Sequence, residues 1–337
     1  MKPTVAITVG DYNGIGPEVT LKAIGHPAVR RKVTPLLIGP AEVFERRAES
    51  LGLRMQFVRH TDAAYRGGGG IHIAEPSPAA PVKINLGRLS FHAGAAAGAA
   101  IKEGVRLTLS GTASALVTAP VSKHALHLAG INVPGQTELL QRLTSSPHVA
   151  MMLVSKTLRV GLVTIHVPIR KVPSALTPEL LHERVTVIHR ALREDWRIRA
   201  PRLAILGLNP HAGESGDLGH EEQRVILPVL ARLRKRGMLL DGPFPADAFF
   251  GRFATGMYDA VIAMYHDQGL IPLKMGAGGR AVNVSVGLPI VRTSPDHGTA
   301  FDIAGKGQAD PASMVEAILL AVTIAENRRK KWPRGNS

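Results

Sequence analysis

Residues 4–24 read TVAITVGDYNGIGPEVTLKAI, which is an aliphatic run, a glycine-rich loop and a helix-compatible segment in immediate succession. Val5 to Val9 is short, apolar and β-branched, which is typical of a strand buried on both faces of a parallel sheet. The segment from Pro17 to Ile24 starts with proline, a residue favoured in the first turn of a helix. The stretch therefore predicts the first strand, loop and helix of an α/β protein.

The same alternation recurs along the 337 residues and predicts parallel strands joined by crossover helices. Capping residues before proline at Thr177-Pro178 and Asp310-Pro311 mark two helix starts. Gly67 to Gly70 is expected to be a loop tip or an insertion. Further strands are expected at 35–38, 115–118, 160–165, 203–208 and 260–264, and helices at 91–109, 178–193, 221–235 and 311–326.

The composition describes a globular protein without thiol chemistry. Apolar residues make up 45% of the chain, enough for two moderate cores, so we expect two α/β domains. The absence of cysteine excludes disulfides, thiolate metal ligands and a cysteine nucleophile, so any metal must be bound by nitrogen or oxygen. Neither a secretion signal nor an apolar stretch of roughly 20 residues is visible, so we expect a cytoplasmic protein with no membrane segment.

The net charge of +15 is compatible with a nucleic-acid partner, but the distribution of charge argues against one. Lysine and arginine are spread along the chain, apart from a basic cluster from Arg328 to Arg334 near the C-terminus. Only four tyrosines and two tryptophans are available to stack on bases. The simpler interpretation is a basic surface exposed to solvent, and we expect no nucleic-acid function.

Three histidines follow expected strands. His166 ends the run 161–165, His211 follows 206–210, and His266 ends the run 261–265. Ligands of open α/β sheets bind outside the carboxyl ends of the strands, so these imidazoles could meet around one divalent cation. Imidazole suits zinc, cobalt and manganese, and magnesium less readily. The alternative is chance, since 14 histidines place several near strand ends, each satisfied by a backbone carbonyl.

Anion-binding groups are expected in three other stretches. The loop Gly10 to Glu18 could direct backbone N–H groups at an anion, although a tight turn between strand and helix is an equal alternative. The long, turn-rich loop from Asp296 to Gly307 has a higher density of polar residues than a connector needs. Lys274, Asn283 and Arg292 could receive a phosphate or carboxylate, or could be ordinary surface residues.

Longer motifs carry a resemblance to a known family. These are Gly-Asp-x-x-Gly-Ile-Gly-Pro-Glu at 10–18, Pro-Gly-Gln-Thr-Glu at 134–138, Asn-Pro-His-Ala-Gly-Glu at 209–214, Tyr-His-Asp-Gln-Gly-Leu-Ile-Pro-Leu-Lys at 265–274 and Arg-Thr-Ser-Pro-Asp-His-Gly-Thr-Ala at 292–300. In this order and nearly end to end, the chain resembles the 4-hydroxythreonine-4-phosphate dehydrogenase family.

The resemblance implies two α/β domains of the isocitrate and isopropylmalate dehydrogenase type, with the active site in the cleft between them. The outer domain is expected from residues 1–120 plus 290–337, and a central dimerising and metal-binding domain from residues 121–289. The implied partner is a second copy of the chain, in a homodimer whose two subunits supply the histidines of each metal site. The implied substrate-binding residues are Gln136, Thr137, Lys274, Asn283 and Arg292.

The implied reaction is the oxidation of 4-phosphohydroxy-L-threonine by NAD to a β-keto acid. That acid loses CO₂ and gives 3-amino-2-oxopropyl phosphate for pyridoxal phosphate synthesis. NADP remains open as the cofactor, because the residues that contact the ribose 2′ position are not identified. A divalent cation would act as a Lewis acid on the hydroxyl oxygen, and Asp247 and Asp267 are the candidates for proton transfer.

The chain departs from the family pattern in two places. Gln136 stands where histidine is usual, and Tyr12-Asn13 replaces the commoner small residues or proline of the first loop. The first alternative function is therefore a related dehydrogenase of another hydroxy acid, such as a phosphorylated threonate or erythronate or a terephthalate-type dihydrodiol dicarboxylate. A remote alternative is an inactive basic protein that binds nucleic acid.

Overall fold

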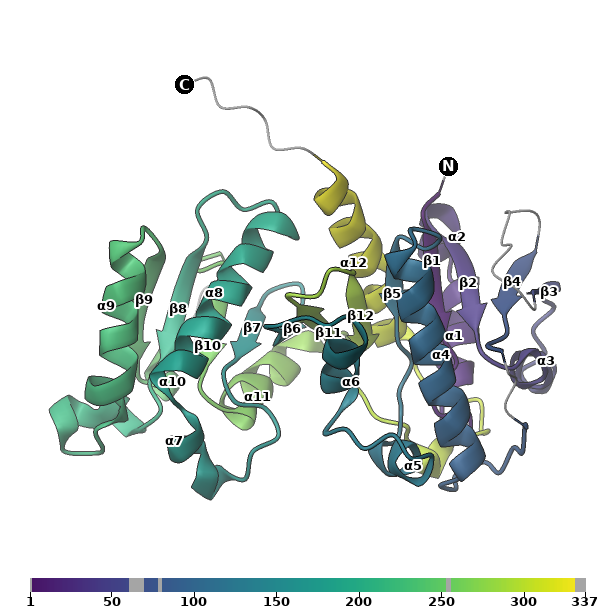
Figure 1. Ribbon diagram of the computed structural model, residues 1–337, viewed down its shortest axis with the longest axis horizontal. Helices are drawn as coiled ribbons and strands as arrows, with labels where there is room; N and C mark the ends of the chain where they lie inside the picture. Colours follow the sequence, from purple (N-terminus) through teal and green to yellow (C-terminus); the bar gives the residue numbers. More distant parts are fainter. Residues whose placement is uncertain (1, 61–69, 78–80, 253–255, 331–337) are drawn as a thin grey trace. The chain divides into compact units, whose positions relative to one another are not determined.

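The computed structural model describes residues 2–60, 70–77, 81–252 and 256–330 and divides the chain into two compact units (Figure 1). Unit 1 comprises Met1–Ser146 and Leu288–Glu326, and unit 2 comprises Pro147–Gly287 and Asn327–Ser337. Both units combine strands and helices, so the predicted α/β fold is confirmed. The chain crosses between units after residues 146, 287 and 326, whereas the boundaries expected from the sequence followed residues 120 and 289. Gly67 to Gly69 of the expected loop tip lie outside the described residues.

The sheet of unit 1 is parallel throughout its described residues, in the order β3-β4-β2-β1-β5-β12. Its first strand begins one residue before the predicted run and is fully buried from Val5 onwards. The strands are β1 (Thr4–Thr8), β2 (Thr34–Ile38), β3 (Phe57–His60), β4 (Ile71–Ala74), β5 (Ala115–Val117) and β12 (Arg292–Pro295).

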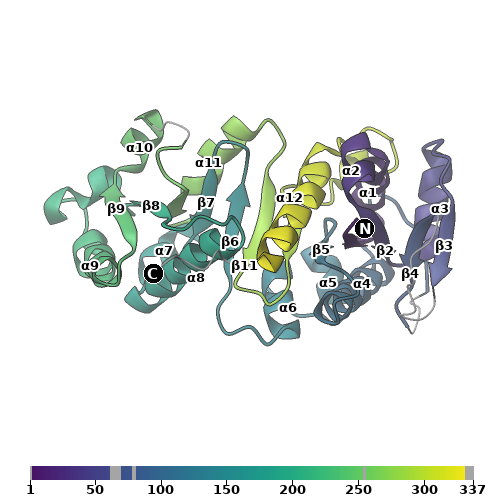
Figure 2. The ribbon, with the colours of Figure 1, turned by 90° about the horizontal axis from the view of Figure 1, so that it is seen from above.

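Helices cover both faces of this sheet, with α1 and α4 on opposite sides (Figure 2). The expected helix at 91–109 is confirmed to the residue, and Ser90 caps it by accepting the N–H of Ala93 at 3.1 Å. The helices are α1 (Gly16–Gly25), α2 (Pro27–Lys32), α3 (Ala41–Ser50), α4 (Phe91–Leu109), α5 (Lys123–Leu128), α6 (Gln136–Leu143), the short η4 (Phe301–Ile303) and α12 (Ala312–Arg329), which ends in unit 2.

The sheet of unit 2 is mixed, in the order β11-β6-β7-β10-β8-β9. Two pairs, β11 with β6 and β6 with β7, are antiparallel, so the expectation of a wholly parallel sheet is wrong here. Only residues 155–158 join β6 to β7, and a connection that short permits only antiparallel pairing. The strands are β6 (Ala150–Val154), β7 (Arg159–Leu162), β8 (Arg202–Leu206), β9 (Leu239–Phe244), β10 (Ala260–Ala263) and β11 (Val282–Val286).

In unit 2, α8 and α11 cover opposite faces of the sheet (Figure 2). The predicted cap at Thr177 is confirmed, since its hydroxyl accepts the N–H of Leu180 at 3.2 Å. The expected helix at 221–235 starts with a π-helical turn, η3 (Glu222–Ile226). The others are η1 (Ile169–Lys171), α7 (Val172–Ala175), α8 (Pro178–Glu194), the turn η2 (Pro210–Gly216), α9 (Leu227–Lys235), α10 (Ala246–Arg252) and α11 (His266–Ala277).

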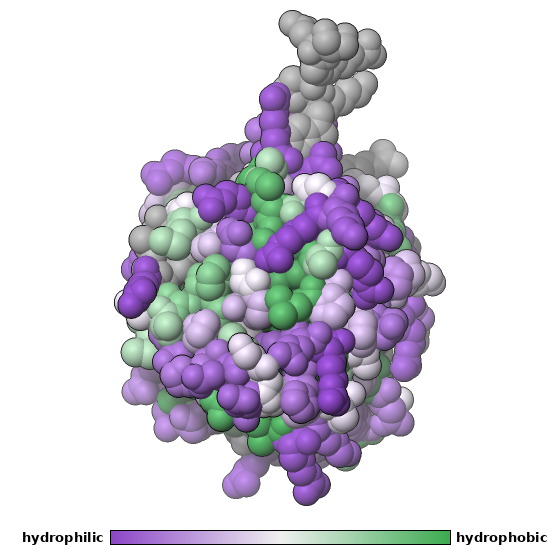
Figure 3. Space-filling view, turned by 90° about the vertical axis from the view of Figure 1, so that its left-hand side faces the viewer, coloured by the Kyte–Doolittle hydropathy of each residue, from purple (hydrophilic) through white to green (hydrophobic). Residues whose placement is uncertain are grey.

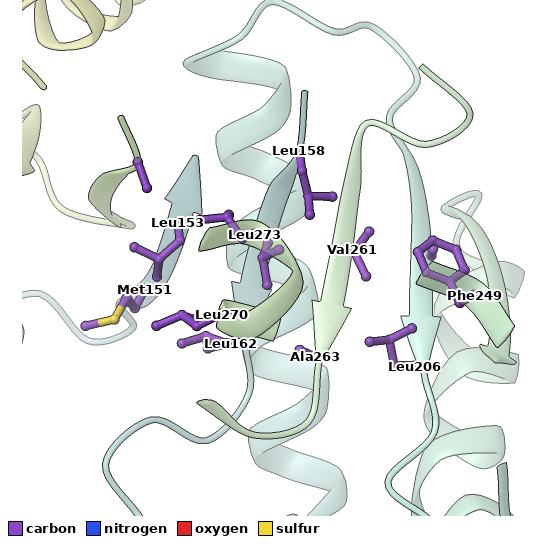
Figure 4. Packing of buried hydrophobic residues seen from close by; sticks show 13 residues of the cluster. Met151, Leu153, Leu158, Leu162, Leu206, Phe249, Val261, Ala263, Leu270 and Leu273 are labelled. Carbon is purple, nitrogen blue, oxygen red and sulfur yellow. The ribbon is translucent and has the colours of Figure 1, made fainter. Parts of the chain in front are cut away.

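The core of unit 2 lies between α11 and the strands β7 and β10 (Figure 4). Leu270 and Leu273 of the helix are almost fully buried against it. Gly269 permits this close approach, because a Cβ there would lie 2.5 Å from Val160 Cγ1. The helix that begins at His266 is thus fixed on the sheet by tight packing.

The surface seen in Figure 3 is largely hydrophilic, with apolar residues in narrow strips. Such strips are ordinary on a folded protein, since much of any protein surface is apolar. Within the described ranges, the helices are too short or too polar to span a bilayer.

Candidate active site

Adjacent strands of unit 2 carry the three predicted histidines at their carboxyl ends. The strands β7, β10 and β8 are neighbours in the sheet, and His166, His266 and His211 follow them in that order. The rings of His166 and His266 lie with their centroids 6.0 Å apart at an interplanar angle of 40°. The structure therefore brings two of the three predicted residues together.

The separation of the two rings is within the reach of a shared divalent cation. A nitrogen-bound zinc ion lies about 2.0–2.1 Å from its ligand atom, hence roughly 3 Å from the ring centre, so two rings sharing one ion have centres up to roughly 6 Å apart. The 6.0 Å between His166 and His266 is within this reach. Imidazole nitrogen is also a ligand that zinc, cobalt and manganese accept.

His211 does not complete a set of three ligands in one chain. Across the described stretches of the chain, no group of three or more histidine, aspartate or glutamate side chains is placed to hold a metal ion. The predicted trio of His166, His211 and His266 thus stays a prediction for the assembled protein.

Asp267 orients the ring of His266. Its Oδ1 lies 2.7 Å from His266 Nδ1, so that nitrogen donates to the carboxylate and Nε2 is the ring atom with a lone pair for a predicted metal ion. The Asp267 side chain is 71% exposed, so solvent weakens the electrostatic part of this contact. A carboxylate bound to a ligand histidine typically fixes the tautomer of the ring.

His211 lies in a left-handed turn. Residues 211–215 all have φ between 39° and 79°, and four of the five carry a side chain. A left-handed conformation costs roughly 1–2 kcal/mol for each such residue. Gly213, at φ 79°, is the member of the turn without this cost, and a Cβ there would lie 2.6 Å from Glu222 Oε2. The turn persists because surrounding contacts hold it.

Asp247, the other candidate for proton transfer, is exposed in the first turn of α10. That helix contacts the turn Pro210–Gly216 that carries His211. The structure therefore places Asp247 on an element next to one predicted metal ligand.

Three of the predicted substrate-binding residues belong to unit 1. Arg292, on β12, is 2% exposed, and Gln136 and Thr137 form the first turn of α6. Arg292 Nη2 donates to Gln136 Oε1 at 3.2 Å and to Thr118 Oγ1 at 2.7 Å, and Nε donates to the same hydroxyl at 3.1 Å. The structure therefore joins Gln136 and Arg292 in one polar cluster.

This cluster keeps a positive charge. Burial lowers the pKa of Arg292 to about 10, although the charge of Glu138 acts to raise it. The guanidinium thus stays protonated at neutral pH. Because every guanidinium N–H is a donor, the oxygen of Gln136 must face Arg292 and its amide N–H groups are left to donate elsewhere. The cluster is suited to an anionic or hydroxyl-bearing group.

The other two predicted substrate-binding residues belong to unit 2. Lys274 is exposed on α11, and Asn283 is half-buried on β11. Both take part in further polar interactions within the protein. The five expected residues are therefore divided between the two units.

The glycine loop after β1 does not present its backbone as expected. The N–H of Gly14 donates to the carbonyl of Asp11 at 3.0 Å, and that of Ile15 donates to the carbonyl of Thr299 at 2.9 Å. The whole stretch 10–18 is buried. These N–H groups are used inside the protein, which favours the alternative of a tight turn between strand and helix, and the turn packs on the polar loop 296–307.

The two unusual residues of this loop hold a distant segment. Asn13 Oδ1 accepts the N–H of Asn85 at 2.7 Å, and Asn13 Nδ2 donates to the carbonyl of Arg88 at 3.0 Å. The hydroxyl of Tyr12 contacts the backbone of Lys83 at 3.3–3.4 Å. Their role is to fasten residues 83–88 to the first loop.

Several residues of these sites were not identified from the sequence. Thr118 was expected only as the end of a strand, and Glu222 only as part of a helix. Gln268 was quoted within a polar motif without a role. Their contacts join segments far apart in the chain, so no local pattern reveals them. The one signal in the sequence was that polar residues directly follow aliphatic runs, which indicates functional loops but not the partners of each side chain.

Comparisons with known proteins identify relatives of this chain. Residues 31–321 match the model of the pyridoxal phosphate biosynthetic protein PdxA. The chain is 44% identical to the 4-hydroxythreonine-4-phosphate dehydrogenase of Acidithiobacillus ferrooxidans, over 97% of this chain and 98% of the relative. It is 42% identical to the D-threonate 4-phosphate dehydrogenase of Cupriavidus necator, over 97% of this chain and 98% of that relative.

A solved structure gives the same result. The crystal structure of 4-hydroxythreonine-4-phosphate dehydrogenase from Klebsiella pneumoniae is similar with a TM-score of 0.85, at 38% identity, over 96% of this chain and 98% of that chain. Both the sequence match and the fold extend over nearly the full length. The chain therefore belongs to the PdxA family of pyridoxal phosphate biosynthetic proteins.

Proposed function

We propose that this protein oxidises 4-phosphohydroxy-L-threonine with NAD as the hydride acceptor and a divalent cation as a cofactor. The product is a β-keto acid that decarboxylates to 3-amino-2-oxopropyl phosphate. The similarity to dehydrogenases of this name supports the substrate. A cytoplasmic homodimer with shared active sites, and no nucleic-acid partner, completes the proposal.

The observation that carries the proposal is the buried Arg292 with its partners Thr118 and Gln136. Taking a guanidinium out of water is costly, so a protein gains from such burial chiefly when the charge binds an anion. The N-terminus of α6, which begins at Gln136, adds the positive end of a helix dipole. We assign Gln136, Thr137 and Arg292 to the binding of a negatively charged group, and Lys274 and Asn283 to the same substrate.

The imidazoles of His166, His211 and His266 would hold the cation, which when bound supplies Lewis-acid polarisation of the substrate hydroxyl. Asp267 holds the ring of His266 in the tautomer that leaves Nε2 available. Asp247 is the candidate that takes the hydroxyl proton at its carboxylate, because its helix adjoins the turn that carries His211.

Sharing of the metal site between subunits can be tested by mixing inactive variants. We expect the homodimer of each single variant, His166→Ala, His211→Ala or His266→Ala, to be inactive. If two ligands come from one subunit and the third from its partner, two of the three pairwise mixtures regain activity, namely those that combine the variant of the third ligand with a variant of either other ligand. Each regains up to about a quarter of wild-type activity after exchange of subunits, because about half of the dimers are mixed and one of the two sites in a mixed dimer keeps three intact ligands. A site confined to one subunit regains activity in no mixture that lacks an intact chain.

A substrate panel tests the reaction. The purified protein is assayed for NADH formation with 4-phosphohydroxy-L-threonine, D-threonate 4-phosphate, erythronate 4-phosphate and a cyclic dihydrodiol dicarboxylate. We expect the highest kcat/KM with the first compound. A higher kcat/KM with any other compound would reject the proposed substrate while leaving the dehydrogenase assignment intact.

The second candidate function is the oxidation of a phosphorylated sugar acid such as D-threonate 4-phosphate. Gln136 favours it, because its amide N–H groups donate and so suit a hydroxyl group better than an ammonium group. The 42% identical relative of that name supports it as well. The matched variant Gln136→His separates the two candidates, since it should shift kcat/KM between the amino acid and the sugar acid if this residue decides the substrate.

A further inference from the structure

A chain of hydrogen bonds links the strand ends that carry the three histidines. It begins at Thr164, two residues before His166, whose N–H and hydroxyl both donate to the carbonyl of Met264, at 3.1 Å and 2.7 Å. Met264 lies two residues before His266. The ends of β7 and β10 are therefore fastened directly to each other.

Gln268 extends the chain of bonds to β8. Its Oε1 accepts the N–H of Met264 at 2.7 Å, and its Nε2 donates to the carbonyl of Gly207 at 2.6 Å. Gly207 is the first residue after β8, and its N–H donates to the carbonyl of Phe244 at 2.8 Å. One amide side chain on α11 thus spans the gap between two strand ends.

Glu222 holds the segment that leads to His211. Its Oε1 accepts the N–H groups of Leu208 and Asn209, at 2.7 Å and 2.8 Å, and its Oε2 accepts from Asn209 Nδ2 at 2.9 Å. The carboxylate is only 2% exposed, so water does not compete for these bonds. It belongs to the π-helical turn η3, a distortion that frequently occurs at functional sites.

The left-handed turn at 211–215 needs this support. Its unfavourable backbone conformation is retained only if neighbouring groups fix both of its ends. Glu222 fixes the residues just before it, and the side chain of Gln223 donates to the carbonyl of Ser215 at its end. The position of His211 thus depends on the bonds by which Glu222 holds the residues before the left-handed turn.

We infer that Gln268 and Glu222 are positioning residues for the metal ligands, a role that rests on the proposed function. Gln268 sets the end of β10, and with it His266, against the end of β8. Glu222 sets the path of the chain from β8 to His211. Neither touches the reacting atoms. Groups that orient metal ligands from behind typically change metal affinity by about 10-fold to 100-fold when removed.

The test uses the full-length protein, Co²⁺ as the probe, and its visible absorption with chelator competition to obtain the dissociation constant. Gln268→Glu keeps the shape of the side chain but replaces the donor to Gly207 by an oxygen that repels it. Glu222→Gln keeps an acceptor for the backbone of 208 and 209 but sets an amide against Asn209 Nδ2. We expect each to raise the dissociation constant at least about tenfold and to alter the absorption bands.

The matched control is Glu221→Gln. Glu221 is adjacent, carries the same charge and also accepts from Asn209 Nδ2, at 2.8 Å, but is not bonded to the backbone of 208 and 209. Its substitution removes the same charge near the cation. We expect a change of less than about threefold, because only the long-range attraction is lost.

The outcomes are distinguishable. If Gln268→Glu and Glu222→Gln both bind Co²⁺ as tightly as the wild type, or if Glu221→Gln raises the dissociation constant as much as they do, the inference is overturned while the proposed metal site stands. If the wild type does not bind Co²⁺, or if His166→Ala binds it as the wild type does, the proposed metal site fails and the inference fails with it. Circular dichroism and urea unfolding check each variant, and if Glu222→Gln is unfolded, Gln268→Glu decides.

Discussion

Asp11 lies in the loop after β1 and is completely buried. Its Oδ1 accepts the N–H of Asn13 at 3.1 Å, and its Oδ2 has no hydrogen-bond partner in the described structure. Burial raises the pKa of this carboxyl from 3.8 to about 6, although the bond from Asn13 acts to lower it. The replacement Asp11→Asn removes the titration and retains an oxygen that can accept from Asn13.

The raised pKa has a direct consequence for stability. Between about pH 4 and pH 6 the folded protein binds a proton at Asp11 that the unfolded chain has released, so stability falls as the pH rises through this range. The full loss is present above pH 6. A difference between 3.8 and about 6 corresponds to about 3 kcal/mol, which is an order of magnitude for one carboxyl group.

Urea unfolding at pH 4, 5, 6 and 7 measures this loss. We expect Asp11→Asn to become more stable relative to the wild type by about 2 kcal/mol between pH 4 and pH 7, since part of the loss has already occurred at pH 4 and other groups cancel in the difference. Asp302→Asn, at an exposed aspartate of the same unit, should show no such trend. A pH-independent difference for Asp11→Asn, or a wild type that gains stability relative to it as the pH rises, refutes the reasoning.

Four further substitutions probe packing and the site. Gly269→Ala should lower the free energy of unfolding by about 1–3 kcal/mol, because a Cβ at this position has no room against β7. Gly276→Ala in the same helix should raise it by up to about 1 kcal/mol, because a Cβ there meets nothing closer than 4.0 Å. Urea midpoints that shift in the same direction for both variants would contradict this reasoning. Arg292→Lys should raise KM for the phosphorylated substrate about 10-fold or more, since the forked contacts to Thr118 are lost, and an unchanged KM would remove Arg292 from the binding site. Asp267→Asn should weaken Co²⁺ binding about 10-fold, and unaltered affinity would show that this carboxylate does not orient His266.

Aliphatic patterning predicted much of the fold from the sequence. The strands that begin near Val5 and Ala260 were found because burial on both faces leaves a continuous apolar run. The helix at 91–109 was found because its sequence is rich in alanine, the residue with the highest helix propensity. The helix α11 was missed because Gly269, Pro272 and Gly276 interrupt its sequence, and packing against the sheet overrides their low helix propensity.

The pairing of strands was harder to predict than their positions. The strand β6 at 150–154 pairs with β11 at 282–286, and no local pattern records a partner so far along the chain. The direction of this pair depends on the tertiary fold. The short turn from β6 to β7 did contain a local signal for antiparallel pairing, in the four residues that separate two apolar runs.

The candidate site was predicted in part for a similar reason. Residues at strand ends could be proposed as neighbours because the strands of a sheet share one edge, and His166 and His266 do lie together. Glu222 and Gln268 could not, because the bond from Glu222 to the backbone of Asn209 spans 13 positions and that from Gln268 to the backbone of Gly207 spans 61. For the glycine loop the sequence left a tight turn and an anion site as equal alternatives, because the bond from the N–H of Ile15 to the carbonyl of Thr299, 284 residues away, has no local signal.

Metal-dependent turnover tests the central claim most directly. The wild type is assayed for NADH formation from 4-phosphohydroxy-L-threonine after treatment with a chelator, and again after addition of Zn²⁺, Co²⁺, Mn²⁺ or Mg²⁺. We expect the chelator to abolish turnover, at least one of these ions to restore it, and His266→Ala to remain inactive with every ion. Full activity of the metal-depleted wild type, or of His266→Ala, would contradict the account.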